Sequence, residues 1–307
     1  MPFLNEEVAL RHRRRTWIPG LLLISPSLIL LAVFVYGLIG WTFNLSLQDR
    51  HNARPAKGYV GFDNYTKLFT ADINDRFVHS LQNLVVFTVV FMAGTLLFGL
   101  IWALLLERRA RAEGFFRTIY LFPMAVSFVA SGVVWRWLMN TGQGDSAGGI
   151  NAIFHGLGLG FLESPWWTHP DWGMAAMAMP AIWQLAGYVM ALFLAGFRGI
   201  PEELREAAVV DGATTFQLYR QVLFPQLTPT ILSALIITGH MSMKMFDLIM
   251  SVSGAQWLTE VPAVYVWQTL LTRDYAKAAA ISVFLLLVVA VVVVPYLIHV
   301  NRSEKRS

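Results

Sequence analysis

The sequence predicts an all-α integral membrane protein with six transmembrane helices, and three observations carry this prediction. Hydrophobic residues make up 56% of the 307-residue chain. Charged residues make up 14%, against roughly a quarter in soluble domains. Several uncharged stretches are long enough to cross a bilayer, which takes about 20 apolar residues in a helix. These stretches are continuously apolar and lack the alternation of outer-membrane barrel strands, so each is predicted to be a helix.

Six stretches have the required length. In chain order they cover residues 17–47, 81–106, 118–135, 172–197, 221–243 and 278–300. The first follows four arginines at 11–15, as the core of a signal peptide would. It is too long for a signal peptide, and no small-residue cleavage site follows it. We therefore predict that this first helix is retained.

Lys and Arg in the connections predict the orientation, because they are enriched in cytoplasmic loops. With the N-terminus inside, the cytoplasmic segments hold 14 of these residues and the outer loops hold 6. Both termini are therefore predicted in the cytoplasm. The domain plan is a basic N-terminus at 1–16, a six-helix domain at 17–300 and a C-terminus at 301–307. The outer loops are predicted to be folded caps.

Residue types exclude several kinds of chemistry. The chain has no Cys, which rules out disulfides, thiolate metal sites and thiol catalysis. Its seven His include no pair at ligand spacing, and no Gly-x-x-x-x-Gly-Lys-[Ser/Thr] loop occurs. We therefore predict no metal, no cofactor and no catalytic site in this chain. The net charge of +4 is small and scattered, so no nucleic-acid partner is predicted.

The most informative connection covers residues 198–227, between the fourth and fifth stretches. A simple connector between helices needs roughly 2 to 8 residues, and this one has 30. Pro201 suits the first position of a helix, and Gly212 suits a helix end with positive φ. A second helical stretch is predicted from Thr214, ending before Pro225. We call this predicted helix, turn and helix the elbow.

Nine residues of the elbow form a pattern, and they are Glu206, Ala207, Ala208, Asp211, Gly212, Ala213, Phe216, Phe224 and Pro225. This pattern resembles the EAA loop of permease subunits in binding-protein-dependent ABC importers. Its Asp-Gly-Ala form is similar to the carbohydrate branch, the relatives of the maltose and glycerol-phosphate permeases. The stretches at 60–65, 116–123 and 134–136 resemble the same branch.

The resemblance implies a type I ABC importer permease fold in the cytoplasmic membrane. The partners that it implies are a second homologous permease subunit in a heterodimer, two ATP-binding ABC subunits, an extracytoplasmic sugar-binding protein and membrane lipid. ATP and Mg would be bound by the partner ATPase and not by this chain.

The resemblance also implies that the elbow is a coupling loop that docks on the ATPase. The docking residues would be Glu206, Ala207, Ala208, Asp211, Gly212 and Ala213. Among these, Glu206 would make a polar contact, Ala207 and Ala208 would allow close packing, and Gly212 would set the turn. The alternative is a helix resting on lipid headgroups, which its acidic residues disfavour because an anionic leaflet repels them.

Polar residues in the fourth and fifth stretches mark a candidate substrate pathway, because ionisable groups at bilayer depth are costly without a function. On a continuous helix His240, Lys244 and Asp247 share one face. Gln184 and Tyr188 present an amide and a phenol four residues apart, chemistry that suits sugar hydroxyls. The alternatives are a Lys244–Asp247 pair near the outer end and helix–helix hydrogen bonds from Gln184 and Tyr188.

The sequence therefore predicts a transmembrane permease subunit of an ATP-driven ABC importer that translocates a sugar, either a glucose-like monosaccharide or an oligosaccharide. The alternative is a stand-alone, proton-coupled secondary sugar carrier that uses Lys244 and Asp247. Such carriers show internal repeats, and residues 1–150 do not convincingly match 151–307. A membrane enzyme is disfavoured because no catalytic arrangement lies at membrane depth.

Overall fold

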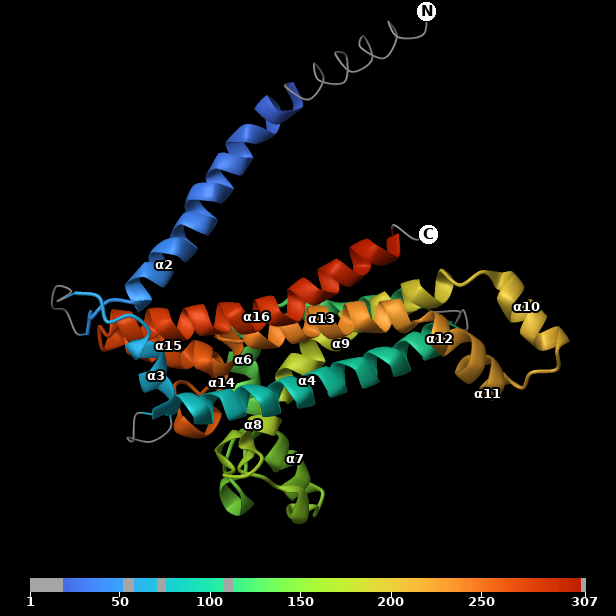
Figure 1. Ribbon diagram of the computed structural model, residues 1–307. Helices are drawn as coiled ribbons and strands as arrows, with labels where there is room; N and C mark the ends of the chain where they lie inside the picture. The colour runs from blue at the N-terminus through green and yellow to red at the C-terminus, as the bar shows by residue number, and fades with distance from the viewer. Residues whose placement is uncertain (1–18, 52–57, 71–75, 108–112, 305–307) are drawn as a thin grey trace, which may run out of the picture.

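The computed structural model describes residues 19–51, 58–70, 76–107 and 113–304. In these ranges the chain is helical (Figure 1), with one isolated bridge between Gln48 and Tyr59. Within the described residues, four helices are long and apolar enough to cross a membrane, or up to six if each of two bent pairs forms one span. The helical class and the number of spans agree with the prediction.

Four spans are single rods. The first is Pro19–Ser46, which includes a π-helical part at Ala32–Gly37 and α2 at Leu38–Ser46. The second is α4, Arg76–Glu107. The fourth consists of α8, Gly173–Ala176, and α9, Ala178–Arg198. The sixth is α16, Tyr275–Glu304.

Two spans are bent. The third is α5, Glu113–Leu121, and α6, Phe128–Leu138, which are joined by a short 3₁₀ turn and meet at 98°. The fifth begins in the elbow, as α11, Thr215–Gln217, a π-helical segment, Leu218–Leu223, and α12, Phe224–Gln226. It bends by 61° into α13, Thr228–Met243.

Shorter helices connect the spans. They are α3, Asp63–Thr70, α7, Gly149–Gly156, α10, Glu202–Val210, α14, Asp247–Val252, and α15, Pro262–Leu271. Figure 1 shows α10 and α11 at one end of the bundle, which we call the elbow end, and α3 and α15 towards the other.

The third span, predicted at 118–135 with a kink at Pro123, is broken near this proline into two helices. Pro123 has no backbone N–H and lies in the 3₁₀ turn. After this turn Val126 is extended, and the hydroxyl of Ser127 accepts a hydrogen bond from the backbone N–H of Ala130 at 3.1 Å. Ser127 therefore caps a new helix, and the proline alone did not reveal this restart.

The first span stands away from the bundle (Figure 1) and packs against α16. No residue of its most apolar 18-residue window is buried within the chain. A mainly apolar helix with so little internal packing has its surface available for lipid or for another membrane subunit.

The segment between the third and fourth spans folds around Asn151, as expected for a cap. This side chain is completely buried. Its amide donates to the backbone carbonyls of Asn140, Gly142 and Ser164 at 2.7–3.1 Å, and its oxygen accepts from the Ser164 N–H and the indole of Trp166. One side chain thus satisfies backbone groups from three turns of the cap.

We expect Asn151→Ala to unfold this cap, because it leaves several buried polar groups without a partner, at roughly 1–3 kcal/mol each. The measurement is the amide hydrogen exchange of residues 140–166, which should accelerate by at least about tenfold. Asn140→Ala is the matched control, because it keeps the backbone carbonyl that Asn151 uses. Unchanged protection in Asn151→Ala would show that the cap is held by other contacts.

Glu163 gives the same cap a pH dependence. Its carboxylate accepts from the backbone N–H of Gly144 at 2.6 Å and pairs with His155 at 3.0 Å. The Gly144 N–H first, and His155 second, hold the pKa of Glu163 below its usual value. A depressed carboxyl pKa stabilises the fold above the unfolded pKa of about 4.3, and this contribution is lost as pH falls through the folded pKa. We expect the cap to loosen below about pH 4, and Glu163→Gln to remove that pH dependence in a thermal-inactivation series.

Candidate functional site

The first arm of the elbow is α10, and its end is built as the sequence predicts. Gly212 has φ of +79°, a conformation that suits glycine because it has no Cβ. The N–H of Gly212 donates to the carbonyl of Val209 at 3.0 Å, and the N–H of Ala213 donates to that of Ala208 at 2.9 Å. This pair of bonds is the Schellman motif, which satisfies carbonyls at a helix end.

The second arm, Thr215–Gln226, begins with a capping box. The Thr214 hydroxyl accepts from the N–H of Gln217 at 3.3 Å, and the Gln217 side chain accepts from the N–H of Thr214 at 2.8 Å. The predicted end before Pro225 is wrong, because the helix continues to Gln226. Pro225 lies in the first turn of α12 after a π-helical segment, where a missing N–H interrupts no regular helix bond.

The outer surface of the elbow carries most of the predicted docking residues. Glu206, Ala207, Asp211 and Gly212 are exposed, and Ala213 is half-buried. Ala208 is 9% exposed, so close packing of a partner against Ala208 does not fit the structure. Large apolar side chains are exposed beside these residues, namely Val209, Val210 and Phe216, with Val210 at 85%. Of these, the sequence analysis singled out Phe216 but not the two valines.

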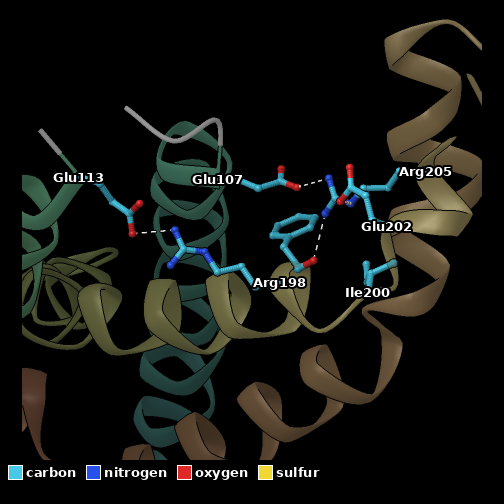
Figure 2. A pocket seen from close by; sticks show the side chains of 7 residues that line it. Glu107, Glu113, Arg198, Ile200, Glu202 and Arg205 are labelled. Atoms are coloured by element: carbon cyan, nitrogen blue, oxygen red, sulfur yellow. Dashed lines mark hydrogen bonds and ion pairs between the residues drawn. The ribbon is translucent and has the colours of Figure 1, made fainter. Parts of the chain in front are cut away.

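A polar pocket of ≈ 990 Å³ lies on the inner side of the elbow (Figure 2) and is lined by Glu107, Glu113, Phe197, Arg198, Ile200, Glu202 and Arg205. Arg205, on α10, pairs with Glu107 at 2.6 Å and donates to the backbone carbonyl of Phe197 at 3.0 Å. Tyr219, on the second arm, donates to the other carboxylate oxygen of Glu107 at 2.6 Å. Both arms therefore meet one carboxylate at the end of α4.

A second ion pair lies in the same pocket. Arg198, at the end of α9, pairs with Glu113, at the start of α5, at 2.6 Å (Figure 2). The sequence analysis missed both pairs. The available signal was that Glu107 and Glu113 flank the basic sequence at 108–112, which connects the second and third stretches on the same predicted side as the elbow.

The fifth span does not present its polar residues on one helix face, so that part of the pathway prediction is wrong. α13 ends at Met243, Lys244 leaves the helical conformation, and α14 begins at Asp247. The N–H of Lys244 and that of Met245 donate to Met241 and Ser242, as in a tight turn. Lys244 and Asp247 are exposed, and no ion pair joins them within the described ranges.

On the fourth span Gln184 is buried, and its Nε2 donates to the carbonyl of Val126 at 2.6 Å. The alternative of a helix–helix hydrogen bond therefore holds for this nitrogen, because Val126 lies at the break between the two helices of the third span. Its Oε1, like the Nδ1 of His240, has no hydrogen-bond partner within the part of the chain that the structure describes. Tyr188 is half-buried and packs beside the α4–α9 core.

Among the described residues, no group of three or more His, Asp or Glu side chains could hold a metal ion. The elbow, the interrupted fifth span and the bundle of candidate spans together define the class of a multi-span membrane transport subunit.

Comparison with known proteins identifies the family within this class. Residues 95–307 match the family described as the binding-protein-dependent transport system inner membrane component. A probable ABC transporter permease protein of Pyrococcus horikoshii is 39% identical, covering 96% of this chain and 100% of the relative. A xylose/arabinose import permease protein of Haloferax volcanii is 30% identical over 88% and 84% of the two chains. An alpha-glucoside transport system permease protein of Rhizobium meliloti is 31% identical over 93% and 82%.

A solved structure shares the fold. The crystal structure of a bacterial ABC transporter involved in the import of the acidic polysaccharide alginate aligns with a TM-score of 0.76, at 22% identity, over 96% of this chain and 98% of that one.

The chain belongs to the inner-membrane permease family of binding-protein-dependent ABC transporters. It is a multi-pass, non-catalytic membrane component, and the resemblance seen in the elbow is confirmed.

Proposed function

We propose that this chain is one permease subunit of an ABC importer that carries a neutral sugar, a glucose-like monosaccharide or an oligosaccharide. The observation that carries the proposal is the elbow, with its exposed Glu206 and its Gly212 turn. Support for a sugar comes from the relatives, whose names refer to xylose, arabinose and alpha-glucosides.

The elbow end is proposed to face the cytoplasm, where the elbow docks on one of two ATP-binding subunits. In Figure 1 the beginning of the first span and the end of α16 point to the same side as the elbow, which supports cytoplasmic termini. The residues proposed to contact the ATPase are Glu206, Ala207, Asp211 and Ala213, with Gly212 holding the turn between them. The exposed Val209 and Val210 add the apolar area that a stable contact needs.

The second permease subunit is proposed to be a homologous chain. The first span supports this, because its apolar surface is not covered by the rest of the chain. An extracytoplasmic sugar-binding protein is proposed to deliver the sugar to the end opposite the elbow, towards which α3 and α15 lie (Figure 1).

The substrate pathway is proposed to run beside the break in the fifth span. Non-helical backbone at membrane depth is tolerated only where protein buries it or where it lines a water-filled cavity. The exposed Lys244 and Asp247 flank this break, and the half-buried His240 precedes it by one helical turn. Together with Gln184 and Tyr188 of α9, these residues supply ammonium, carboxylate, imidazole, amide and phenol groups for sugar hydroxyls.

The test is uptake by the complete complex in sealed vesicles, with labelled D-glucose, D-xylose, maltose and trehalose as the panel. We expect uptake of at least one sugar that needs both ATP and the binding protein, and we expect the ATPase to co-purify with the tagged chain. Uptake driven by a pH gradient, without ATP, would instead establish the proton-coupled carrier. Lack of uptake of any sugar in the panel would contradict the proposed substrate class.

A further inference from the structure

The joint between the fourth span and the elbow is a weak point in the chain. α9 ends at Arg198 and α10 begins at Glu202, and the short link between them is not helical. A force applied to α10 would bend this link before it moved the span, unless side chains held the joint. Those side chains are on the inner side of the elbow.

Arg205 holds the first arm across this joint (Figure 2). Its guanidinium reaches forward to Glu107 and back to the Phe197 carbonyl, one of the carbonyls at the end of α9. Two different nitrogens of its planar guanidinium reach these two partners in a fixed geometry. Tyr219 brings the second arm to the same Glu107 carboxylate. We call Glu107, Arg205 and Tyr219 the elbow clamp.

The position of Glu107 is unfavourable unless it has these partners. It is the last residue of α4 that the structure describes, and its side chain is only 7% exposed, so its charge is poorly hydrated. Buried ion pairs can often be replaced by apolar residues at no loss of stability. Fold stability therefore does not explain why this position has a carboxylate.

We propose that Glu107 is a positioning residue for energy coupling: it fixes both arms of the elbow to the end of the second span. The ATPase then moves α4 together with α9 and α13, and the link at 199–201 does not absorb the displacement. α4 and α9 share a buried core that includes Ala103, Leu106, Phe193 and Phe197, so they move as one unit once the elbow is held. This inference rests on the proposed function, because it requires that an ATPase docks on the elbow.

The test measures coupling in the reconstituted complex, as sugar transported per ATP hydrolysed, using whichever member of the four-sugar panel the parent complex takes up. In Glu107→Gln the elbow still reaches the ATPase, so we expect ATP hydrolysis to continue. We expect the transport ratio to fall about fivefold or more, the scale of typical coupling between sites. Tyr219→Phe removes the bond from one arm and should give a smaller decrease in the same direction.

Glu113→Gln is the matched control. It breaks an ion pair of the same length in the same pocket, at the end of α9, and touches neither arm of the elbow. The double variant Glu107→Met with Arg205→Met guards against misfolding. It should keep thermal stability, as apolar replacements of buried pairs do, and still lose coupling.

A second readout follows the joint itself. The chain has no Cys, so cysteines placed at Leu204 on α10 and Val89 on α4, both exposed, carry spin labels at defined positions when the partner subunits are cysteine-free. We expect one narrow distance distribution in the otherwise unchanged chain, a broad one after Glu107→Gln and a narrow one after Glu113→Gln.

An unchanged transport ratio together with a narrow distance distribution in Glu107→Gln would overturn the proposed role of the elbow clamp in coupling. This result differs from a failure of the proposed function, in which the parent complex itself would not take up sugar.

Discussion

Replacing Gly212 by Val together with Glu206 by Ala should abolish ATP-driven uptake. Gly212 has φ of +79°, where a β-branched residue is strained by roughly 1–3 kcal/mol. The two Schellman hydrogen bonds, from the N–H groups of Gly212 and Ala213, would break, and the second arm would then point in a different direction. Loss of the exposed Glu206 carboxylate removes the proposed polar contact with the ATPase. We expect uptake to fall by roughly tenfold or more, and less ATPase to co-purify with the chain.

Gly199→Ala is the matched control for this variant. Gly199 also lies beside α10, but its φ is −79°, which any residue adopts, and a Cβ there would meet only ordinary contacts. Uptake by Gly199→Ala should equal that of the parent chain. If the double variant transported sugar at the parent rate, the elbow would not be the coupling element.

Replacing Glu260 by Gln should cause the largest loss of stability at the opposite end. Glu260 is completely buried and holds Arg76 with two bonds of 2.6 Å, while the Arg76 guanidinium lies 4.8 Å from the centre of the Tyr265 ring. Breaking a buried pair by removing one partner costs about 3–5 kcal/mol. The Arg76 side chain is 35% exposed, so we expect the lower end of this range. Thermal inactivation of the purified subunit, followed by size-exclusion chromatography, measures the change.

The Lys67–Asp63 pair provides the comparison. It lies on α3 with both side chains exposed, and such pairs contribute about 1 kcal/mol or less. Lys67→Gln should therefore leave the inactivation temperature nearly unchanged. Equal effects of the two substitutions would show that the Arg76–Glu260 pair does not hold α4 and α15 together.

Local signals made the elbow predictable. Gly212 ends a helix because of its own backbone freedom, and Thr214 begins the next one because its hydroxyl lies within reach of the N–H of Gln217. The predicted end before Pro225 is wrong because a π-helical segment precedes the proline. The missing N–H of Pro225 then interrupts no regular helix bond, and nothing in the sequence signals this segment. A kink is predictable at Pro123, but a proline alone does not say whether a helix kinks or restarts.

Pairings between distant residues could not be predicted. Glu107 and Tyr219 are 112 positions apart, and Arg76 and Glu260 are 184 apart. A single sequence contains these residues but gives no reason to choose one partner over another. The fifth-span prediction assumed one continuous helix, and the turn at Lys244 separated residues that ideal helical spacing would have aligned. The docking and pathway assignments of individual residues stay predictions.

The isolation of the first span has a consequence for biogenesis. A helix that gains little free energy from its own chain is packed against protein only after assembly with another subunit. An unassembled copy therefore exposes a long apolar helix to the quality-control proteases of the membrane. Cellular abundance of this protein should therefore follow the supply of its companion chain.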